Sequence, residues 1–394
     1  AYNTFNSYNI YKCGLIPYEG GRRPSNLDMK TFRTGGIHPN ENKLSAGKKI
    51  REVSIPQQVV IPLAHYSGRP SEAVVKKGDL VKVGQLIGKA DGYISANVHS
   101  SVSGKVNKVD VQLDASGYKR PAVFIDVDGD EWLETIERTT EIERTCNFSK
   151  EEILTKIKSA GIVGLGGATF PAHVKLSPPP GKKADVLIIN AVECEPYLTC
   201  DHQLMLEQGE EIMVGVSILM KVLDVEKAFI GIECNKLDAV EHMSRLAQSF
   251  SGITVQPLKV QYPQGGEKQL IDAILRRKVP SGKIPIEVGV VVMNVATTFS
   301  VYEAVQKEKP LIERVMTISG KDFPNPGNYR VRLGIYLSEV VNQAGGVPPG
   351  TGKIIGGGPM MGRSLMNLDV PMAKGSAGTV FMPDQIAARK EDRN

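Results

Sequence analysis

A glycine-rich segment at residues 161–175, GIVGLGGATFPAHVK, holds the densest set of residues able to bind a phosphate. Four glycines fall within seven positions, and Lys175 follows a Phe-Pro step. A backbone without side chains can approach a phosphate closely. The spacing matches neither G-x-G-x-x-G nor G-x-x-x-x-G-K-[ST], so the two commonest nucleotide loops are disfavoured. On these residues alone, phosphate binding and a set of ordinary tight turns both stay open.

Two carboxylates, Glu193 and Glu195, come just after an apolar run at 186–190. Such a pair can act as general acid and base, bind a metal, or accept hydrogen bonds from ribose hydroxyls. Only His202 lies at a suitable spacing to join them as a ligand, so we expect no metal. The structural alternative is an acidic loop that caps the next helix.

Two further junctions combine glycines or polar residues with the end of a predicted strand. Tyr262, Gly265 and Glu267 follow the predicted strand 254–260, and Asn294 and Thr297 follow the predicted strand 288–294. The carboxyl ends of parallel strands share one edge of a sheet, where ligands bind. We therefore expect these junctions and the glycine loop to converge on one rim.

The elements that must position these residues form a regular alternation. Ser149 and Glu152 match a capping box that opens a helix leading into the glycine loop. Buried strands are predicted at 186–190, 228–232, 254–260 and 288–294, and helices at about 237–250, 267–275 and 299–305, with another ending near 223. Buried strands that alternate with helices indicate a parallel sheet covered on both faces, which makes this an α/β, Rossmann-like domain.

The flanking regions are rich in predicted strands. Glycine turns separate short strands between 55 and 127, which indicates a small β-barrel or sandwich. From 315 onward a turn pair, a short strand and a helix at 337–344 suit a β-grasp-like module. The predicted organisation is 1–28 as an added or poorly ordered extension, 29–140, 145–310 and 311–380 as domains, and 381–394 as an exposed tail or linker.

Composition excludes several classes of function. The 394 residues carry a net charge of only +5, and no basic run is interleaved with aromatics, so we expect no nucleic-acid partner. The longest apolar run, 212–223, is too short to span a bilayer. Five cysteines without a C-x-x-C pair and the lack of a secretory signal favour reduced thiols in a cytoplasmic setting.

The phrase VVKKGDLVKVGQLIGKADGYISANVHSSVSGKVNKVD resembles the barrel-sandwich hybrid fold of lipoyl and biotinyl carrier domains. Carrier domains present an acceptor lysine on a hairpin, whereas the matching stretch here, 97–101, reads NVHSS. The resemblance without that lysine implies a structural or docking module. His99 is expected to be structural.

The glycine loop together with INAVECEPYLTCDHQ resembles the FMN- and NADH-binding subunit of respiratory complex I and related soluble hydrogenases. The module order, the opening FRTGGIHPNENKL and a C-terminal SLBB-type module are similar to the C subunits of Rnf ferredoxin:NAD oxidoreductase complexes over residues 29–381. The resemblance implies an NADH-dependent flavin oxidoreductase module that exchanges hydride between NAD(H) and FMN. It also implies a peripheral place on the cytoplasmic face of the cell membrane, in an ion-pumping complex with other Rnf subunits and, indirectly, ferredoxin.

The resemblance also implies roles for individual residues. No side chain need act as acid or base, because hydride passes directly between nicotinamide and flavin. The flavin phosphate would be held by Gly164, Gly166, Gly167 and Lys175. The FMN pocket would be lined by Asn190, Glu193, Tyr262, Gly265, Asn294 and Thr297. The nicotinamide nucleotide would lie near Phe170, Glu195 and Glu267.

Three departures from the family pattern bear on these expectations. Val192 replaces an acidic residue and Pro178 replaces an aromatic one, which affects nucleotide binding more than flavin binding. Family members continue into a ferredoxin-like domain, so [4Fe-4S] clusters are expected only in a missing C-terminal domain. A cobalamin reductase-like flavoprotein and a non-catalytic docking subunit that has lost its cofactor are the alternatives. The presence of Lys175, Glu193 and Glu195 argues against a loss of cofactor binding.

Overall fold

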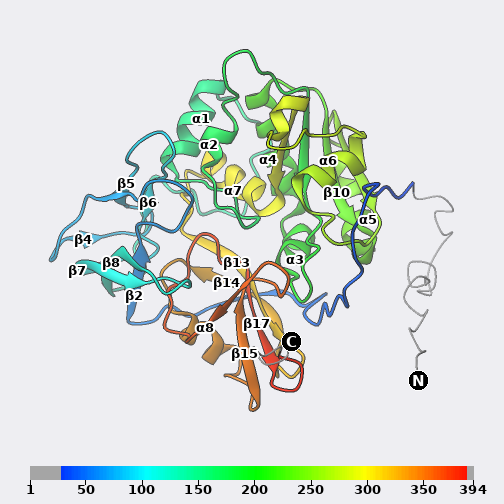
Figure 1. Cartoon of the computed structure of the whole chain (residues 1–394). Coiled ribbons are helices and arrows are strands. Elements are labelled where there is room, and N and C mark those ends of the chain that lie inside the picture. The colour runs from blue at the N-terminus through cyan, green and yellow to red at the C-terminus, as the bar shows by residue number, and fades with distance from the viewer. Residues whose placement is uncertain (1–27, 388–394) are drawn as a thin grey trace.

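The computed structural model describes residues 28–387, so nearly all of the predicted extension at 1–28 and the last residues of the predicted tail lie outside the described residues. Three parts surround a common centre (Figure 1). An α/β body contains the helices α1 to α7, a β-sandwich lies beside it, and a mixed sheet with α8 lies below both. The predicted fold class, an α/β flavin-domain fold between two β-rich modules, is confirmed.

The α/β body is built on a fully parallel sheet with the order β11-β10-β9-β12. Its strands are β9 (Val186–Asn190), β10 (Ala228–Glu233), β11 (Ile253–Leu258) and β12 (Val290–Asn294). The chain winds outward from β9 to β11 and then returns to β9 on its other side with β12. A sheet of this order binds ligands beyond the carboxyl ends of the two strands where the winding reverses. Asn190 and Asn294, the last residues of β9 and β12, pair in register at this point.

Helices cover both faces of this sheet, as the continuous apolar strands predict. Alternate residues of β9 enter different cores: Ile188 packs in the cluster that includes Leu270 of α6 (Glu267–Leu275), whereas Leu187 and Ile189 join the main core. That main core contains residues of α1 (Lys150–Ser159), α4 (Gly209–Leu223), α5 (Leu237–Ala247) and α7 (Val295–Gln306). The short α3 (Cys200–Glu207) connects β9 to α4.

The starts of α1 and α7 show where local capping signals in the sequence predict a helix boundary correctly and where they do not. The capping box at α1 is confirmed: Ser149 Oγ accepts from the Glu152 amide, and the Glu152 carboxylate accepts from the Ser149 amide at 2.7 Å. The predicted start of α7 near residue 299 is wrong. The helix begins at Val295, because Asn294 Oδ1 caps it by accepting from the amides of Ala296 (2.9 Å) and Thr297 (3.2 Å).

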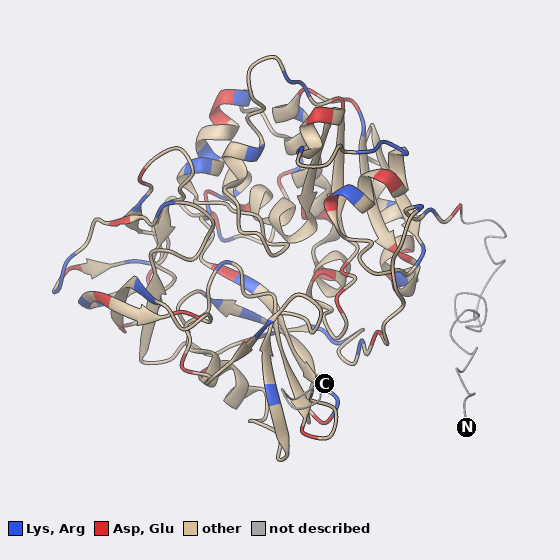
Figure 2. Cartoon of the chain, viewed as in Figure 1, with Lys and Arg blue, Asp and Glu red and all other residues tan. Residues whose placement is uncertain are grey.

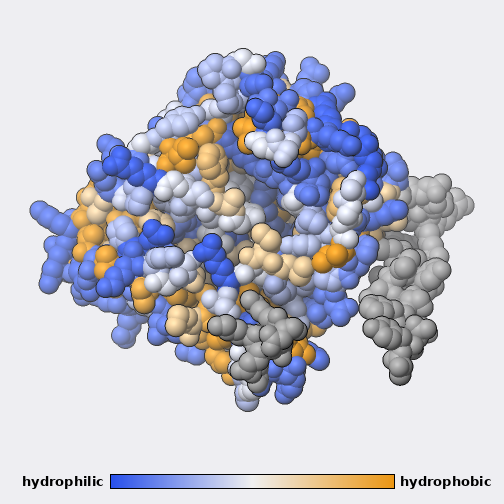
Figure 3. Space-filling view, viewed as in Figure 1, coloured by the Kyte–Doolittle hydropathy of each residue, from blue (hydrophilic) through white to orange (hydrophobic). Residues whose placement is uncertain are grey.

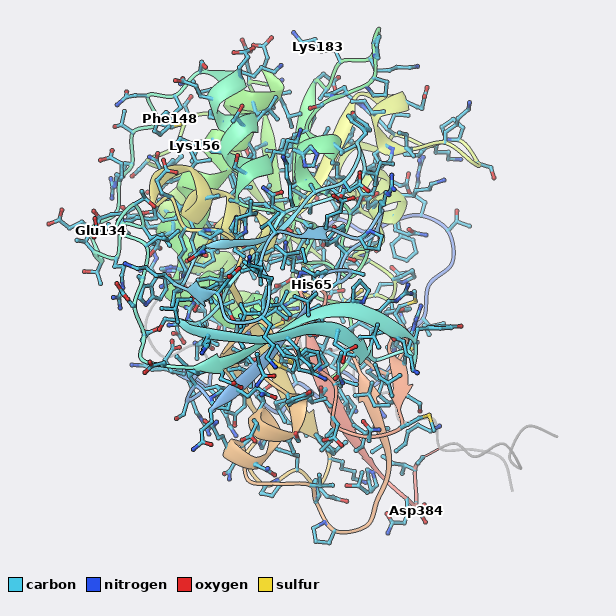
Figure 4. All side chains as sticks on the ribbon, turned by 90° about the vertical axis from the view of Figure 1, so that its left-hand side faces the viewer. His65, Glu134, Phe148, Lys156, Lys183 and Asp384 are labelled. Carbon is cyan, nitrogen blue, oxygen red and sulfur yellow. The ribbon has the colours of Figure 1, made fainter. Side chains whose placement is uncertain are left out.

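The predicted β-sandwich is present between residues 58 and 127. One sheet contains β2 (Gln58–Pro62), β8 (Lys119–Val127), β7 (Gly104–Leu113) and β4 (Leu80–Val81), and the other contains β3 (Glu72–Ala73), β5 (Leu86–Lys89) and β6 (Val98–His99). The stretch that replaces a carrier hairpin is buried: His99, Ser100 and Ser101 are at most 7% exposed. Figure 4 shows His65, also buried, within the molecule near these strands.

The C-terminal sheet has the order β1-β14-β13-β17-β15-β16 and carries α8 (Leu337–Gln343). Its strands are β1 (Ile50–Glu52), β13 (Glu313–Gly320), β14 (Gly327–Arg332), β15 (Thr351–Gly356), β16 (Arg363–Leu365) and β17 (Gly378–Pro383). β1 was not predicted, and it pairs in parallel with β14 although nearly 280 residues separate them.

The exposed tail predicted from residue 381 begins later. β17 continues to Pro383, because Phe381 is 1% exposed and packs against Phe323 with ring centroids 5.1 Å apart. Because its side chains fill the core, the strand extends past the predicted boundary at residue 381. The sequence signal of the tail is its charge, and that charge begins only at Asp384.

Basic and acidic residues are interspersed along the ribbon, in keeping with the small net charge (Figure 2). The face in Figure 3 likewise carries scattered apolar patches among polar ones. No helix within residues 28–387 combines the length and the apolar character needed to cross a membrane.

Phe381→Ala should lower the free energy of unfolding by about 3–5 kcal/mol, because it removes a large buried side chain and leaves a cavity. Met366→Ala is the matched control, since Met366 is 99% exposed. It should change stability by no more than about 0.5 kcal/mol. Denaturant unfolding followed by circular dichroism measures both. Equal effects of the two variants would contradict the assignment of residue 381 to the core.

Candidate functional site

The glycine loop lies over the end of β12. The amide of Gly164 donates to the Phe170 carbonyl at 2.8 Å and closes the loop. The amide of Leu165 donates to Thr297 Oγ1 at 2.8 Å, and a Cβ on Gly166 would lie 3.1 Å from the Cβ of Asn294. These contacts join the loop to the start of α7, so the loop lies at the point where the winding of the sheet reverses.

The tip of the loop is bare backbone. Gly166 and Gly167 are exposed, and no atom lies within 4 Å of the position that a Cβ on Gly167 would take. Gly167 has a φ of +118°, a conformation that residues with side chains rarely adopt. The tip therefore presents main-chain atoms to an open space.

Lys175 ends the short helix α2 (Ala172–Lys175) and forms an ion pair with Glu267, the first residue of α6. The two side chains are 30% and 42% exposed, so the pair contributes little to stability. The structure thus brings the predicted phosphate-binding lysine next to a residue predicted to lie near the nucleotide. The ammonium of Lys175 remains accessible to a further anion.

The turn after β11 packs on the end of β9. Asn190 Nδ2 donates to the Gly265 carbonyl at 2.8 Å, and a Cβ on Gly265 would lie 3.3 Å from Cys194 Sγ. The hydroxyl of Tyr262 points to Glu195 Oε1 at 3.5 Å. The residues singled out at the three strand ends and the glycine loop therefore converge on one rim, as their spacing predicted.

Glu193 and Glu195 differ in their surroundings. Glu193 accepts from the amides of Asp201 (2.8 Å) and His202 (3.2 Å) at the start of α3, so its carboxylate caps that helix. This is the structural alternative raised for the acidic loop, and the role of Glu193 in FMN binding stays a prediction. Glu195 instead faces Tyr262 and the amide of Met360, and burial raises its pKa.

Two lysines that sequence reasoning missed, the half-buried Lys43 and the buried Lys236, hold this acidic loop from behind. Lys43 Nζ donates to the carbonyls of Glu193 (2.7 Å), Glu195 (2.9 Å) and Leu198 (2.8 Å), and burial lowers its pKa to about 8. Lys236 Nζ donates to the Val192 carbonyl at 2.8 Å. Lys43 belongs to the FRTGGIHPNENKL segment that supported the family resemblance, which was the one available signal.

Two buried cations of the C-terminal module hold the glycine loop in the same way. Lys374 Nζ donates to the carbonyls of Gly161 (2.8 Å) and Asn97 (2.7 Å), and burial lowers its pKa to about 7. Arg314 donates to the carbonyls of Leu165 (3.4 Å) and Lys374 (2.6 Å). All three parts of the fold therefore contribute to the position of this loop.

Asp201 is a half-buried acid beside the site. Its Oδ2 accepts from Asn294 Nδ2 at 2.7 Å. Burial, followed by the charge of Glu193, raises the pKa of Asp201 to about 7. Glu193, Cys200 and Asp201 also form the one set of potential metal ligands within residues 28–387. It fits a metal poorly, because the Glu193 oxygens already accept amide hydrogen bonds and burial raises the pKa of the Cys200 thiol.

Known families match each part of the chain. The Nuo51 FMN-binding domain matches residues 157–303, the RnfC barrel sandwich hybrid domain matches 30–130, and the SLBB domain matches 315–364. These matches define a protein with a flavin-type α/β domain between two β-rich modules.

Curated relatives resemble the chain over most of its length. The C subunit of the proton-translocating ferredoxin:NAD(+) oxidoreductase complex of Clostridium ljungdahlii is 47% identical over 360 residues, which cover 89% of this chain and 76% of the relative. The C subunit of the Na(+)-translocating complex of Acetobacterium woodii is 43% identical, with 92% and 81% covered. The chain belongs to this family, the C subunits of ion-translocating ferredoxin:NAD(+) oxidoreductase complexes.

A solved structure supports the fold. The NAD+-reducing [NiFe]-hydrogenase in its H2-reduced state aligns with a TM-score of 0.50 and 23% identity, covering 60% of this chain and 47% of the hydrogenase chain. At this identity the likeness concerns the fold alone.

Asp201→Asn should stabilise the protein at neutral and alkaline pH. Because folding raises the pKa of Asp201 from its usual value to about 7, the native state holds a proton that the unfolded state releases between about pH 4 and pH 7. The contribution of Asp201 to stability therefore falls as the pH rises through this range. Asparagine keeps an acceptor for Asn294 without the charge, so the free energy of unfolding at pH 8 should rise by about 1–3 kcal/mol.

Denaturant unfolding at a series of pH values between about 4.5 and 8 measures this difference. The gain should grow with pH. A difference between the two proteins that does not vary with pH would contradict the account of Asp201.

Proposed function

We propose that this chain binds FMN beyond the carboxyl ends of β9 and β12 and exchanges hydride between NAD(H) and FMN. The observation that carries the proposal is the bare tip of the glycine loop over the point where the winding of the sheet reverses. The match of residues 157–303 to an FMN-binding domain and the names of the relatives support it.

The residues of the loop fit the phosphate of FMN. Gly166 and Gly167 are exposed, the position of a Cβ on Gly167 is open space, and the partly exposed Lys175 supplies a positive charge nearby. A phosphate would compete with Glu267 for the Lys175 ammonium. Gly164 closes the loop through its bond to Phe170 and so fixes the shape of the cradle.

The rim of the sheet supplies polar groups for the rest of the cofactor. We assign Asn190, Tyr262, Gly265, Asn294 and Thr297 to the surroundings of the flavin. Asn190, Gly265, Asn294 and Thr297 are already held by hydrogen bonds to one another or to neighbouring loops, whereas the Tyr262 hydroxyl reaches Glu195 only at 3.5 Å. Preformed geometry of this kind lowers the cost of ordering a ligand.

Glu195 and Phe170 are assigned to the nicotinamide nucleotide, with Glu267 near it. A carboxylate can accept hydrogen bonds from both hydroxyls of a ribose, and an aromatic ring can stack on a base. FMN, when bound, would supply the ring that accepts hydride. The chain's own residues then bind and orient the two nucleotides, and no side chain acts as acid or base.

We infer that the chain works beside other subunits of a membrane-associated, ion-pumping complex, peripheral to the membrane on its cytoplasmic face. The membership of the relatives in such complexes supports this placement. Electrons would pass between the flavin and ferredoxin through [4Fe-4S] clusters, which the family resemblance places in a C-terminal ferredoxin-like domain. The competing functions are a cobalamin reductase-like flavoprotein and a docking subunit without cofactor. Binding of FMN would exclude the docking subunit without cofactor.

The purified chain should bind FMN, and anaerobic addition of NADH should bleach the visible absorbance of the bound flavin. Quenching of flavin fluorescence measures the binding, and the loss of the flavin's visible absorbance measures its reduction. A chain that binds no FMN would refute the proposal. Binding without bleaching would refute the hydride exchange and leave a flavin-binding function.

Lys175→Ala should weaken FMN binding about tenfold or more, because a charged hydrogen bond to phosphate is lost. Glu195→Ala should mainly weaken NADH binding. Lys183→Ala is the matched control, since Lys183 is a surface lysine, 72% exposed, paired with Asp224 away from the loop. Figure 4 shows Lys183 at the outer edge of the α/β body. Equal effects of the Lys175 and Glu195 variants on both ligands would contradict the assigned roles.

A further inference from the structure

A loop of the C-terminal module reaches the acidic residue assigned to the nucleotide. Residues 357–362, GGPMMG, connect β15 to β16, and we call this segment the β15–β16 loop. Its shape is fixed by its own backbone: the amide of Gly362 donates to the Gly358 carbonyl and that of Gly357 donates to the Gly378 carbonyl, each at 2.7 Å. The loop is thus a rigid turn attached to β17.

The loop contacts Glu195 through main-chain atoms. The amide of Met360 donates to Glu195 Oε2 at 3.1 Å. The other carboxylate oxygen, Oε1, faces the hydroxyl of Tyr262 at 3.5 Å. One oxygen is therefore bound by the C-terminal module, while the other is held only loosely, at the limit of hydrogen-bonding distance.

Gly358 makes this approach feasible. A Cβ at this position would lie 2.1 Å from Glu195 Oε2 and 2.8 Å from the Cβ of Glu195. No φ in the left-handed region requires glycine at 358, so its backbone would accept alanine. The absence of a side chain at Gly358 is explained by the closeness of Glu195 rather than by the shape of the turn.

We propose that the β15–β16 loop forms one wall of the nicotinamide nucleotide site and that Gly358 and the amide of Met360 position Glu195 for it. The inference rests on the proposed function and adds a structural element that determines how the chain binds NAD(H). With Oε2 held by the loop, the Glu195 side chain keeps one rotamer, and Oε1 is presented to a ribose hydroxyl of NAD(H). A side chain ordered in advance loses less conformational entropy when the nucleotide binds.

The proposal gives the C-terminal module a part in nucleotide affinity. The module contacts the proposed nucleotide side of the site through the β15–β16 loop and the glycine loop through Lys374 and Arg314. The first contact should affect NADH and not FMN, since Glu195 is assigned to NADH alone. A change in NADH binding without a change in FMN binding would distinguish a positioning role of the loop from a general loss of structure.

Gly358→Ala tests the proposal on the FMN-loaded chain. The new methyl group should displace the Glu195 carboxylate and raise the Kd for NADH about tenfold, with the Kd for FMN unchanged. Met361→Ala is the matched control, because it keeps the main chain of the loop and alters a side chain that is 79% exposed. Thermal unfolding shows whether each variant is folded.

Combining Gly358→Ala with Glu195→Gly makes the test specific, because glycine at position 195 also removes the Cβ that the new methyl group would meet at 2.8 Å. Once Glu195 is removed, Gly358→Ala should have no further effect on the Kd for NADH, since the two changes act through one group. An equal effect of Gly358→Ala in both backgrounds would overturn the proposal. Tighter NADH binding by Gly358→Ala would also overturn it, because the loop would then compete with the nucleotide for Glu195.

The same measurements separate this inference from the proposed function. If Glu195→Ala weakens NADH binding and Gly358→Ala does not, the role of the loop is wrong and the assignment of Glu195 stands. If Glu195→Ala leaves NADH binding unchanged, the assignment of Glu195 fails and the role of the loop fails with it. FMN binding by the wild-type chain tests the flavin site independently of both.

Discussion

Lysine and arginine side chains that donate to backbone carbonyls hold the candidate site together, and three of the four are buried. Lys43 and Lys236 bind the loop after β9 from behind, and Lys374 and Arg314 bind the glycine loop. A buried charge is costly unless it is hydrogen-bonded, and each of these cations has carbonyl partners at 2.6–2.9 Å. The contacts tie residues far apart in sequence into one arrangement.

This arrangement explains why a flavin-type domain would need its two neighbours. Lys43 comes from the segment before the sandwich, whereas Lys374 and Arg314 come from the C-terminal module. The sandwich adds the Asn97 carbonyl and the buried stretch around His99. In this chain the barrel-sandwich fold therefore serves as a packed support at the place where a carrier domain would expose its lysine.

Local patterns predicted most of the α/β body and the convergence at its rim. β9, α6 and the capping box of α1 agree with the sequence, because strong periodicity and capping residues act within a few positions. The start of α7 differs from the prediction because Asn294, at the end of a strand, is also the cap of the helix that follows it directly. The pairing of β1 and the extent of β17 depend on contacts across the whole chain, which no local pattern contains.

Local sequence patterns likewise predict only part of the candidate site. Its glycines, carboxylates and amides were recognisable by type and position, but the helix-capping role of Glu193 and the contact between Met360 and Glu195 required the three-dimensional structure. Buried lysines are particularly hard to identify, because nothing in the local sequence distinguishes them from surface lysines.

A crystal structure of the chain with FMN would test the central claim most directly. The account predicts that the phosphate lies at the exposed backbone of Gly166 and Gly167, with Lys175 turned from Glu267 toward it. The flavin would then lie along the ends of β9 and β12. A flavin bound away from this edge of the sheet, or a phosphate held by residues other than the glycine loop and Lys175, would contradict it.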